Sequence, residues 1–207
     1  MIVAIDGPSA AGKGTLSRRL AATLGYHHLD TGLLYRAVGA RLLAAGIDPA
    51  DAEAAGHAAR ELGPADIARE GLREENVGRA ASVVAANPAV RAALVEFQRR
   101  FAAQPPGAVL DGRDIGTVIC PGAEVKLYVV ASAEVRARRR HDELRGRGEP
   151  ATYAAVFRDL QERDARDQAR GTAPAKPAED AIVLDTTDLT ADEVFAQAIG
   201  IVRSRSS

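Results

Sequence analysis

The segment that most constrains the fold of this chain lies at its N-terminus, where an apolar run meets a glycine-rich loop. Residues 2–5 (IVAI) are apolar and mostly β-branched, which is typical of a buried parallel strand. The loop GPSAAGKGT follows, and residues 15–24 then carry leucines at four-residue steps, which predicts a helix that ends at Gly25. A strand, a loop with G-x-x-x-x-G-K spacing and a helix in this order predict a phosphate-binding loop.

The chemistry of such a loop explains its residue types. Glycines let the backbone curl so that N–H groups point inward at a phosphate, and the helix N-terminus adds partial positive charge. Lys13 adds a full charge that can reach the outer phosphates. The hydroxyl that usually follows this lysine and binds Mg²⁺ comes one position later, at Thr15, so it binds the metal either directly or through water or phosphate. We expect ATP to contact Gly7, Pro8, Ser9, Ala10, Ala11, Gly12, Lys13, Gly14 and Thr15.

Beyond this segment, short apolar runs alternate with helical patterns along the chain. Such alternation predicts an α/β fold with a parallel sheet flanked by helices. Residues 47–78 fit neither pattern, and we expect them to form an insert of short helices. The predicted strands are residues 2–5, 28–30, 108–110, 125–130 and 182–184. The predicted helices are residues 15–24, residues 31–45, one that begins at Pro88, one capped by Ser132, residues 153–170 and one that follows Thr190.

Composition excludes several classes of function. Basic residues number 27 and acidic residues 28, so the chain lacks the positive excess of a dedicated nucleic-acid binder, and only 4% of its residues are aromatic. Its one cysteine, Cys120, rules out a disulfide framework. No apolar run approaches the roughly 18 residues that a membrane helix needs. From 207 residues we expect a single domain. The first residues, MIVAIDG, have no basic region before the apolar run and are predicted to be a strand rather than a signal peptide, so we expect a cytoplasmic protein. We also expect a monomer with no nucleic-acid or membrane partner.

Arginines follow two of the predicted strands. Arg113 and Asp114 come directly after the third strand, and Arg36 lies one turn into the helix after the second. Ligands of open parallel sheets bind at these carboxyl ends. These arginines bear on which group would accept a phosphoryl group from ATP. A hydroxyl acceptor usually needs a catalytic base, whereas a nucleoside monophosphate does not, because its second pKa near about 6 leaves its phosphate ionised at neutral pH. Such an acceptor instead needs cations that hold two mutually repelling phosphates in line.

A second group of arginines lies on one predicted helix. Arg163, Arg166 and Arg170 are spaced i, i+3 and i+7, so they share one face of that helix. Asp167 lies on the same face, four residues after Arg163. Two interpretations stay open: the face binds phosphate, or it is a solvated surface stabilised by ion pairs with neighbouring acids.

The densest basic run lies in residues 136–147, which contain six arginines. It could be a nucleic-acid patch, but the near-zero net charge and the scarcity of aromatics argue against this. It could be a lid that closes over ATP phosphates and excludes water, with Gly146 and Gly148 as hinges. It could also be an exposed helix face. We expect a few of these arginines to be functional and the rest to be surface residues.

Five segments of the chain form a specific combination: IDGPSAAGKGT, LDTGLLYR, RAASVVAANPAVRAAL, LDGRDIGTVICPGA and ERDARDQARGTAP. In this order they resemble the bacterial cytidylate kinase (CMP kinase) family, a group of nucleoside monophosphate kinases with a P-loop NTPase core. The resemblance covers most of the chain except residues 47–78. In this family a small β-meander often precedes the cytosine-reading segment, but the stretch ELGPADIAREGLREENVG is too short for three strands.

The resemblance implies transfer of the γ-phosphoryl group of ATP, with Mg²⁺, to CMP or dCMP. It implies that Ser82 and Arg91 read the cytosine edge, and that Asp114 and Asp167 are sugar-side or positioning carboxylates. The implied catalytic residues are Lys13, Arg113, Arg163 and Asp114. The implied CMP-binding residues are Thr31, Arg36, Ser82, Arg91, Arg113, Asp114, Arg163, Asp167 and Arg170.

The same resemblance implies a division of the single domain and leaves two alternatives. The expected core comprises residues 1–32, 107–140 and 171–207, the CMP-binding insert residues 33–106 and the lid residues 141–170. One alternative is a kinase for UMP or AMP, against which Ser82 and Arg91 argue. The other is a non-catalytic nucleotide-binding module, which would have no need of the arginines at the strand ends.

Overall fold

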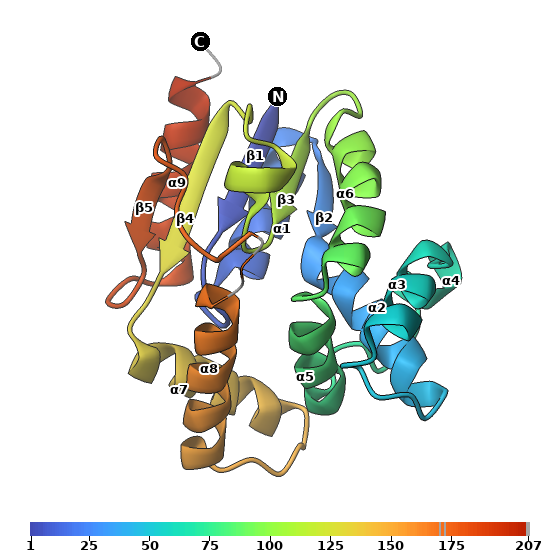
Figure 1. The fold of residues 1–207 in the computed structure, drawn as a ribbon. Coiled ribbons are helices and arrows are strands. Elements are labelled where there is room, and N and C mark those ends of the chain that lie inside the picture. Colours follow the sequence, from blue (N-terminus) through green and yellow to red (C-terminus); the bar gives the residue numbers. More distant parts are fainter. Residues whose placement is uncertain (170, 172, 206–207) are drawn as a thin grey trace.

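The computed structural model describes residues 1–169, 171 and 173–205, and its centre is a five-stranded parallel sheet (Figure 1). The strands pair in the order β2-β3-β1-β4-β5, all in parallel. The predicted fold class and all five predicted strands are therefore confirmed. The strands are β1 (Ile2–Asp6), β2 (His27–Asp30), β3 (Ala108–Asp111), β4 (Val125–Val130) and β5 (Ile182–Asp185).

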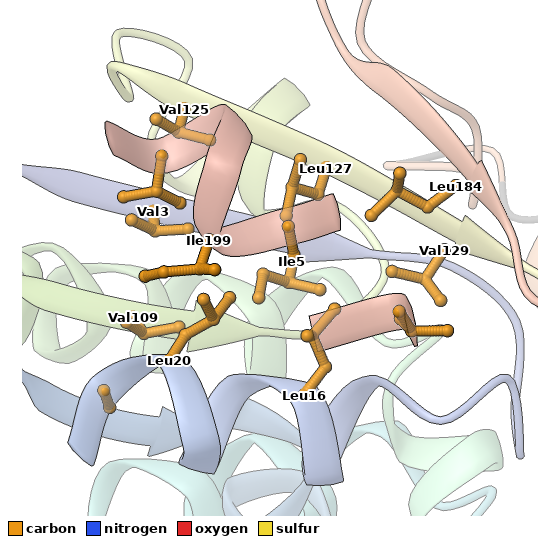
Figure 2. Close-up of a cluster of buried hydrophobic side chains, with 14 of the residues drawn as sticks. Val3, Ile5, Leu16, Leu20, Val109, Val125, Leu127, Val129, Leu184 and Ile199 are labelled. Carbon is orange, nitrogen blue, oxygen red and sulfur yellow. The ribbon is translucent and has the colours of Figure 1, made fainter. Parts of the chain in front are cut away.

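One face of the sheet is covered by α1 (Lys13–Leu24) and α9 (Ala191–Ser204). Figure 2 shows how side chains from the strands meet leucines of α1 and Ile199 of α9 in one apolar layer. Residues of β1, β3, β4 and β5 point to this layer, and in β1 Val3 and Ile5 lie in it while Ala4 lies on the other face. Burial on both faces of the central strands β1 and β3 explains why they read as continuous apolar runs.

The opposite face is covered by α6 (Pro88–Ala102) and by a short π-helix, η1 (Ile115–Ile119). The predicted start of α6 is confirmed, because Asn87 caps it and accepts hydrogen bonds from the backbone N–H groups of Ala89 and Val90. Ile115 and Ile119 of η1 are buried against the sheet. The turn between β3 and η1 is thereby fixed at the carboxyl edge of the sheet.

Residues 33–106 form four further helical segments besides the long α6, and none of these residues, all described, forms a strand. The expected short helices and the expected absence of a meander are therefore observed. Gly39 of α2 lets this helix approach α5 closely, because a Cβ there would lie 2.9 Å from Ala80 Cβ. The helices are α2 (Thr31–Ala44), α3 (Ala52–Arg60), α4 (Pro64–Ile67) and α5 (Glu75–Val84), with a small core of their own.

Two helices, α7 (Ala133–Gly146) and α8 (Tyr153–Gln168), lie beyond the carboxyl edge of the sheet, across from α5 (Figure 1). They share a small apolar core, against which Ala10 of the glycine-rich loop packs. The predicted caps are confirmed, since Ser132 caps α7 and Thr190 forms a capping box with Glu193 at α9. The helix predicted for residues 153–170 is observed from Tyr153 to Gln168 and ends at its C-cap, Ala169, earlier than predicted.

The helices were also compared with what a membrane span requires. Within the described residues, no single helix is long and apolar enough to cross a membrane. The pair formed by α5 and α6 passes the test of length and composition together, but the two helices meet at an angle of 99°.

Candidate active site

A cleft with a volume of about 340 Å³ opens at the carboxyl edge of the sheet, bordered by the glycine-rich loop, α2, α5 and α8. Nearly all predicted site residues within the described part of the chain line this cleft. Gly7 and Pro8 do not line it, and Arg170 lies outside the described residues. The predicted residues that line it are Ser9, Ala10, Ala11, Gly12, Lys13, Gly14, Thr15, Thr31, Arg36, Ser82, Arg91, Arg113, Asp114, Arg163 and Asp167.

The glycine-rich loop leaves β1 at Asp6 and enters α1 at Lys13, as its motif requires. Gly7 is packed against β4: a Cβ at this position would lie 2.0 Å from the carbonyl oxygen of Val129, so the site has no room for a side chain. Lys13 Nζ donates a 2.7 Å hydrogen bond to the carbonyl oxygen of Pro8. Burial, and then the positive charge of Arg113, lower the pKa of Lys13 to about 7. The lysine is therefore desolvated, and an anionic ligand would stabilise its protonated form.

Asp6 was not singled out from the sequence, yet it orders one wall of the cleft. Its carboxylate accepts 2.8 Å hydrogen bonds from the backbone N–H groups of Ile115 and Gly116. Burial raises its pKa to about 6 in spite of these hydrogen bonds. Asp6 thus ties the end of β1 to the start of η1 and fixes the turn that carries Arg113 and Asp114. Its one sequence signal was its place at a strand end, beside the loop.

Arg113 links the loop to α8. Its Nε donates to Asp167 at 2.8 Å and its Nη2 donates to Ser9 Oγ at 2.6 Å. Burial alone would lower the pKa of Arg113, but the charge and hydrogen bond of Asp167 raise it above its usual value. Asp167 and Ser9 therefore hold Arg113 as a cation between α8 and the glycine-rich loop.

A buried ion pair occupies the far end of the cleft. Arg91 donates to Asp114, and their exposed fractions are 4% and 5%. Arg91 Nη1 also donates to the hydroxyl of Tyr35 at 3.4 Å. Ser82 lies on the neighbouring α5, is buried, and accepts a 3.2 Å hydrogen bond from Arg166 Nε. Asp114 therefore orients the arginine at this end of the cleft.

Three further arginines of the cleft lie close enough to influence one another: Arg36, Arg140 and Arg163. Arg36 Nη1 donates to the carbonyl oxygen of Leu72 at 2.8 Å, and burial together with the charges of Arg163 and Arg140 lowers its pKa to about 10. Burial, and then Arg113, lower the pKa of Arg163. Buried cations that repel one another are stabilised when a polyanion binds between them, so this arrangement favours polyanion binding.

Glu75 at the start of α5 is one of several acids that face these arginines. Its carboxylate accepts a 2.5 Å hydrogen bond from Arg140 Nη2 and lies 3.8 Å from Arg163 Nη1. Because Arg140 and Arg163 belong to α7 and α8, Glu75 joins the insert to the helices beyond the sheet. Sequence reasoning missed Glu75, since nothing local marks which arginine an acid will meet.

The arginines of residues 136–147 lie in different environments. Arg140 lines the cleft. Arg136 is buried and binds the carbonyl oxygen of Ser9 at 3.2 Å and Asp164 at 2.7 Å, which fastens α7 to the loop. Arg139 binds Thr186 at 2.9 Å. The cleft also contains Arg18, Tyr35, Arg73 and Asp111, which the sequence had not indicated.

The residues that could hold a metal ion are few. Among the described residues, no group of three or more His, Cys, Asp or Glu side chains is arranged to bind one. Thr15 lies at the cleft with an exposed side chain, and its hydroxyl is a suitable oxygen ligand. Such a donor set fits a hard cation held chiefly by the phosphates of a nucleotide, with one protein hydroxyl beside it.

A parallel sheet with a phosphate-binding loop at its carboxyl edge and a cleft rich in buried arginines defines a P-loop kinase that acts on nucleotides. The family model for cytidylate kinase matches residues 3–204. The chain belongs to the cytidylate kinase family. Membership confirms the predicted family, the predicted class of enzyme and the predicted phosphorylation of CMP by ATP.

Individual relatives agree with the family match. The chain is 61% identical over 207 residues to a cytidylate kinase of Paramagnetospirillum magneticum, covering 99% of this chain and 98% of that one. It is 61% identical over 204 residues to a cytidylate kinase of Methylocella silvestris, covering 99% and 94%. A solved structure of an uncharacterized protein from Eubacterium ventriosum has a TM-score of 0.56 at 13% identity, covering 99% and 98% of the two chains, which supports the fold alone.

Proposed function

We propose that this cleft transfers the γ-phosphoryl group of ATP to CMP or dCMP, giving ADP and CDP or dCDP, a step of pyrimidine nucleotide metabolism. One observation carries the proposal: Lys13 of the glycine-rich loop, the buried Arg91–Asp114 pair, and Arg113 and Arg163 all line one cleft. The loop suits a nucleoside triphosphate, the buried pair suits a small polar base, and the arginines suit two phosphates that meet.

The ATP end uses the glycine-rich loop. Gly12 and Gly14 flank Lys13 at the N-terminus of α1, where backbone N–H groups and the helix dipole favour phosphate. The pKa of Lys13, lowered to about 7 by burial, will rise when phosphates arrive, so the lysine binds them as a cation. Mg²⁺ would be held by the ATP phosphates with Thr15 nearby, and it would neutralise charge on the transferred group.

The acceptor phosphate would be held by Arg36, Arg113 and Arg163. No general base is required, because a nucleoside monophosphate with a second pKa near about 6 is already ionised at neutral pH. Catalysis then consists of alignment and charge stabilisation by fixed cations. Asp167 serves this step by holding the Arg113 guanidinium through a 2.8 Å hydrogen bond.

The base would lie at the far end, beside Ser82 and Arg91. Both groups are buried, so the wrong base would leave polar atoms without partners, which is costly. We place the enzyme in the cytoplasm as a monomer that acts on free nucleotides. The division into a core (residues 1–32, 107–140 and 171–207), a CMP-binding insert (33–106) and a lid (141–170) belongs to the same proposal.

The proposal is tested by measuring ADP release with CMP, dCMP, UMP and AMP as acceptors. We expect CMP and dCMP to have the highest kcat/KM. Faster reaction of UMP or AMP would refute the assigned acceptor.

The site assignment is tested with Lys13→Ala and Arg163→Ala. Each should lower kcat by roughly 10²-fold or more, since fixed cations stabilise the transferring phosphoryl group. Circular dichroism would verify that both variants fold. Normal turnover in two folded variants would contradict the assigned phosphate sites.

A further inference from the structure

His28 of β2 contacts an acid that lines the cleft. Its Nε2 lies 2.9 Å from Oδ2 of Asp111, the last residue of β3. A carboxylate can only accept hydrogen bonds, so His28 is the donor. The two side chains are 21% and 8% exposed, and Asp111 lines the cleft whereas His28 does not. His28 therefore holds the Asp111 carboxylate without itself occupying the cleft.

The backbone of Asp111 is held at the same place. The hydroxyl of Thr31, the first residue of α2, donates a 2.8 Å hydrogen bond to the carbonyl oxygen of Asp111. Asp30 of β2 pairs with Asp111 in the register of the two strands. Packing here is close, because a Cβ on Gly112 would lie 2.7 Å from Thr31 Oγ1. With its backbone fixed, the carboxylate moves by rotation of its side chain, and the hydrogen bond from His28 restricts that rotation.

The Asp111 carboxylate lies among cations that it could otherwise bind. Burial and the charge of Arg113 lower the pKa of Lys13, but the negative charge of Asp111 opposes them. Burial alone would also lower the pKa of Arg113, and Asp111 is one of the acids that raise it instead. The carboxylate is thus close enough to influence both cations. Among the described residues, Asp111 nevertheless has its hydrogen bond with His28 and forms no ion pair with either cation.

We propose that His28 is a positioning residue that restrains the Asp111 carboxylate and keeps it from pairing with the cations of the cleft. Lys13 and Arg113 thereby stay available to nucleotide phosphates. The inference rests on the proposed function, in which these two cations bind phosphate. A carboxylate that is released in a partly desolvated cleft would turn to a nearby cation, since ion pairs are stronger there than in water. It would then compete with phosphate for that cation.

The experiment measures the Kd for ATP by isothermal titration calorimetry in EDTA, so that only protein groups contact the phosphates. His28→Leu removes the donor, whereas His28→Gln keeps one, because the glutamine amide nitrogen can replace Nε2 of the imidazole. Asp111→Asn removes the competing charge, and the double variant His28→Leu/Asp111→Asn closes a double-mutant cycle. His27→Leu is the matched control, since His27 lies on the same strand, is exposed and contacts the carbonyl oxygen of Pro105 instead.

We expect His28→Leu to raise the Kd for ATP about tenfold, the effect of one hydrogen bond to a charged group. His28→Gln should stay within about twofold of the unaltered protein because it keeps the donor, and so should His27→Leu as a surface substitution. Asp111→Asn should lower the Kd, since a negative charge leaves the cleft. In the Asp111→Asn background, His28→Leu should have no further effect, because no carboxylate remains to be restrained.

Three results would overturn the inference, provided that circular dichroism shows the variants to be folded. An unchanged Kd in His28→Leu would show that Asp111 needs no restraint. Equal rises in His28→Leu and His28→Gln would show that the donor is not what matters. A rise that persists in the Asp111→Asn background would show that His28 does not act through the carboxylate.

Lys13→Ala separates this inference from the proposed function. We expect this variant to bind ATP more weakly in EDTA, because it lacks a phosphate-binding cation. If its Kd equals that of the unaltered protein, the assigned phosphate site is wrong and the inference fails with it. If Lys13→Ala weakens binding and His28→Leu does not, the proposed function stands and only the role of His28 is refuted.

Discussion

Individual charged side chains of the cleft are held by neighbouring protein groups even without a nucleotide. Lys13 donates to the loop carbonyl of Pro8, and Arg113 is shared between Ser9 and Asp167. These contacts fix the positions of the cations, so little conformational entropy is lost when phosphates bind. Desolvation of the same groups shifts their pKa values, which makes the protonation of Lys13 a property that can be measured.

The lowered pKa of Lys13 predicts the pH dependence of ATP capture. With a pKa of about 7 in the free enzyme, the lysine loses its proton as the pH rises through 7, so the charge that attracts phosphate declines. We expect kcat/KM for ATP to fall from pH 7 to pH 9, since this parameter reports groups of the free enzyme. With a second pKa near about 6, a nucleotide phosphate is already roughly nine-tenths ionised at pH 7, so its own titration changes the rate little in this range and would favour binding as the pH rises.

The control for this prediction is kcat in the same range. Bound phosphates favour the protonated lysine, so the turnover of the saturated enzyme should change little between pH 7 and pH 9. A kcat/KM that stays level to pH 9 would contradict a lowered pKa for Lys13.

At the scale of elements, the base site depends on close packing between α2 and α5. A Cβ on Gly39 would lie 2.9 Å from Ala80 Cβ and 3.1 Å from the backbone nitrogen of Ala81. These distances are shorter than van der Waals contact, so the two helices would have to separate. Ser82 directly follows Ala81 on α5, and the position of its hydroxyl therefore depends on a glycine of another helix.

Gly39→Ala should lower the free energy of unfolding by about 1–3 kcal/mol, the usual cost of overpacking, and should raise the KM for CMP. Gly200→Ala is the matched control. Gly200 lies in α9 with no atom within 4 Å of a Cβ, so alanine there should stabilise the helix by about 0.5–1 kcal/mol. Chemical denaturation measures the free energy of unfolding of both variants, and steady-state kinetics measures the KM. The same sign of change in the two variants would contradict the packing account.

The ion pairs of Glu75 act between elements as well. They connect α5 with α7 and α8, and the Glu75 side chain is only 27% exposed. Glu75→Gln should weaken this connection by about 1 kcal/mol, which raises the equilibrium constant for local opening roughly fivefold. Amide hydrogen exchange in α8, which measures local opening, should become faster by the same factor. The exposed Glu96–Arg100 pair on α6 is the control, because Glu96→Gln should change exchange little. Equal effects of the two substitutions would contradict this role.

For the whole molecule, net charge conceals how charge is distributed. The chain carries 27 basic and 28 acidic residues, yet basic side chains outnumber acidic ones eight to five among the described residues that line the cleft. Such an excess of positive charge raises the local concentration of a small polyanion in the cleft. The balance of the chain as a whole and the excess in the cleft are thus compatible.

Nucleotide binding should therefore stabilise the folded molecule selectively. At a concentration of 100 Kd, CMP should add about 2.7 kcal/mol and raise Tm by roughly 5–10 °C for a chain of this size. AMP at the same concentration should raise Tm much less, and added salt should reduce the shift for CMP. Thermal unfolding monitored by fluorescence of an external dye measures this. A shift for AMP equal to that for CMP would contradict selective binding.

The sequence by itself determined the features that depend on neighbours along the chain. The glycine-rich loop, the five strands, the caps of α6, α7 and α9, and the short helices in place of a meander are set by local backbone preferences and apolar periodicity. Family motifs also placed most of the cleft residues, such as Ser82 and Arg91, although nothing in their local spacing fixes what they face.

Only the tertiary structure decided which charged groups meet. Asp6 holds a turn more than a hundred residues away, Glu75 meets Arg140 and Arg163, and Arg166 of α8 donates to Ser82 of α5. Such pairings depend on how helices dock at the edge of the sheet, and a charged residue on a helix face has the same local pattern whether it meets solvent or a partner. The physical reason is that burial and long-range approach, rather than spacing along the chain, determine the environment of a charge.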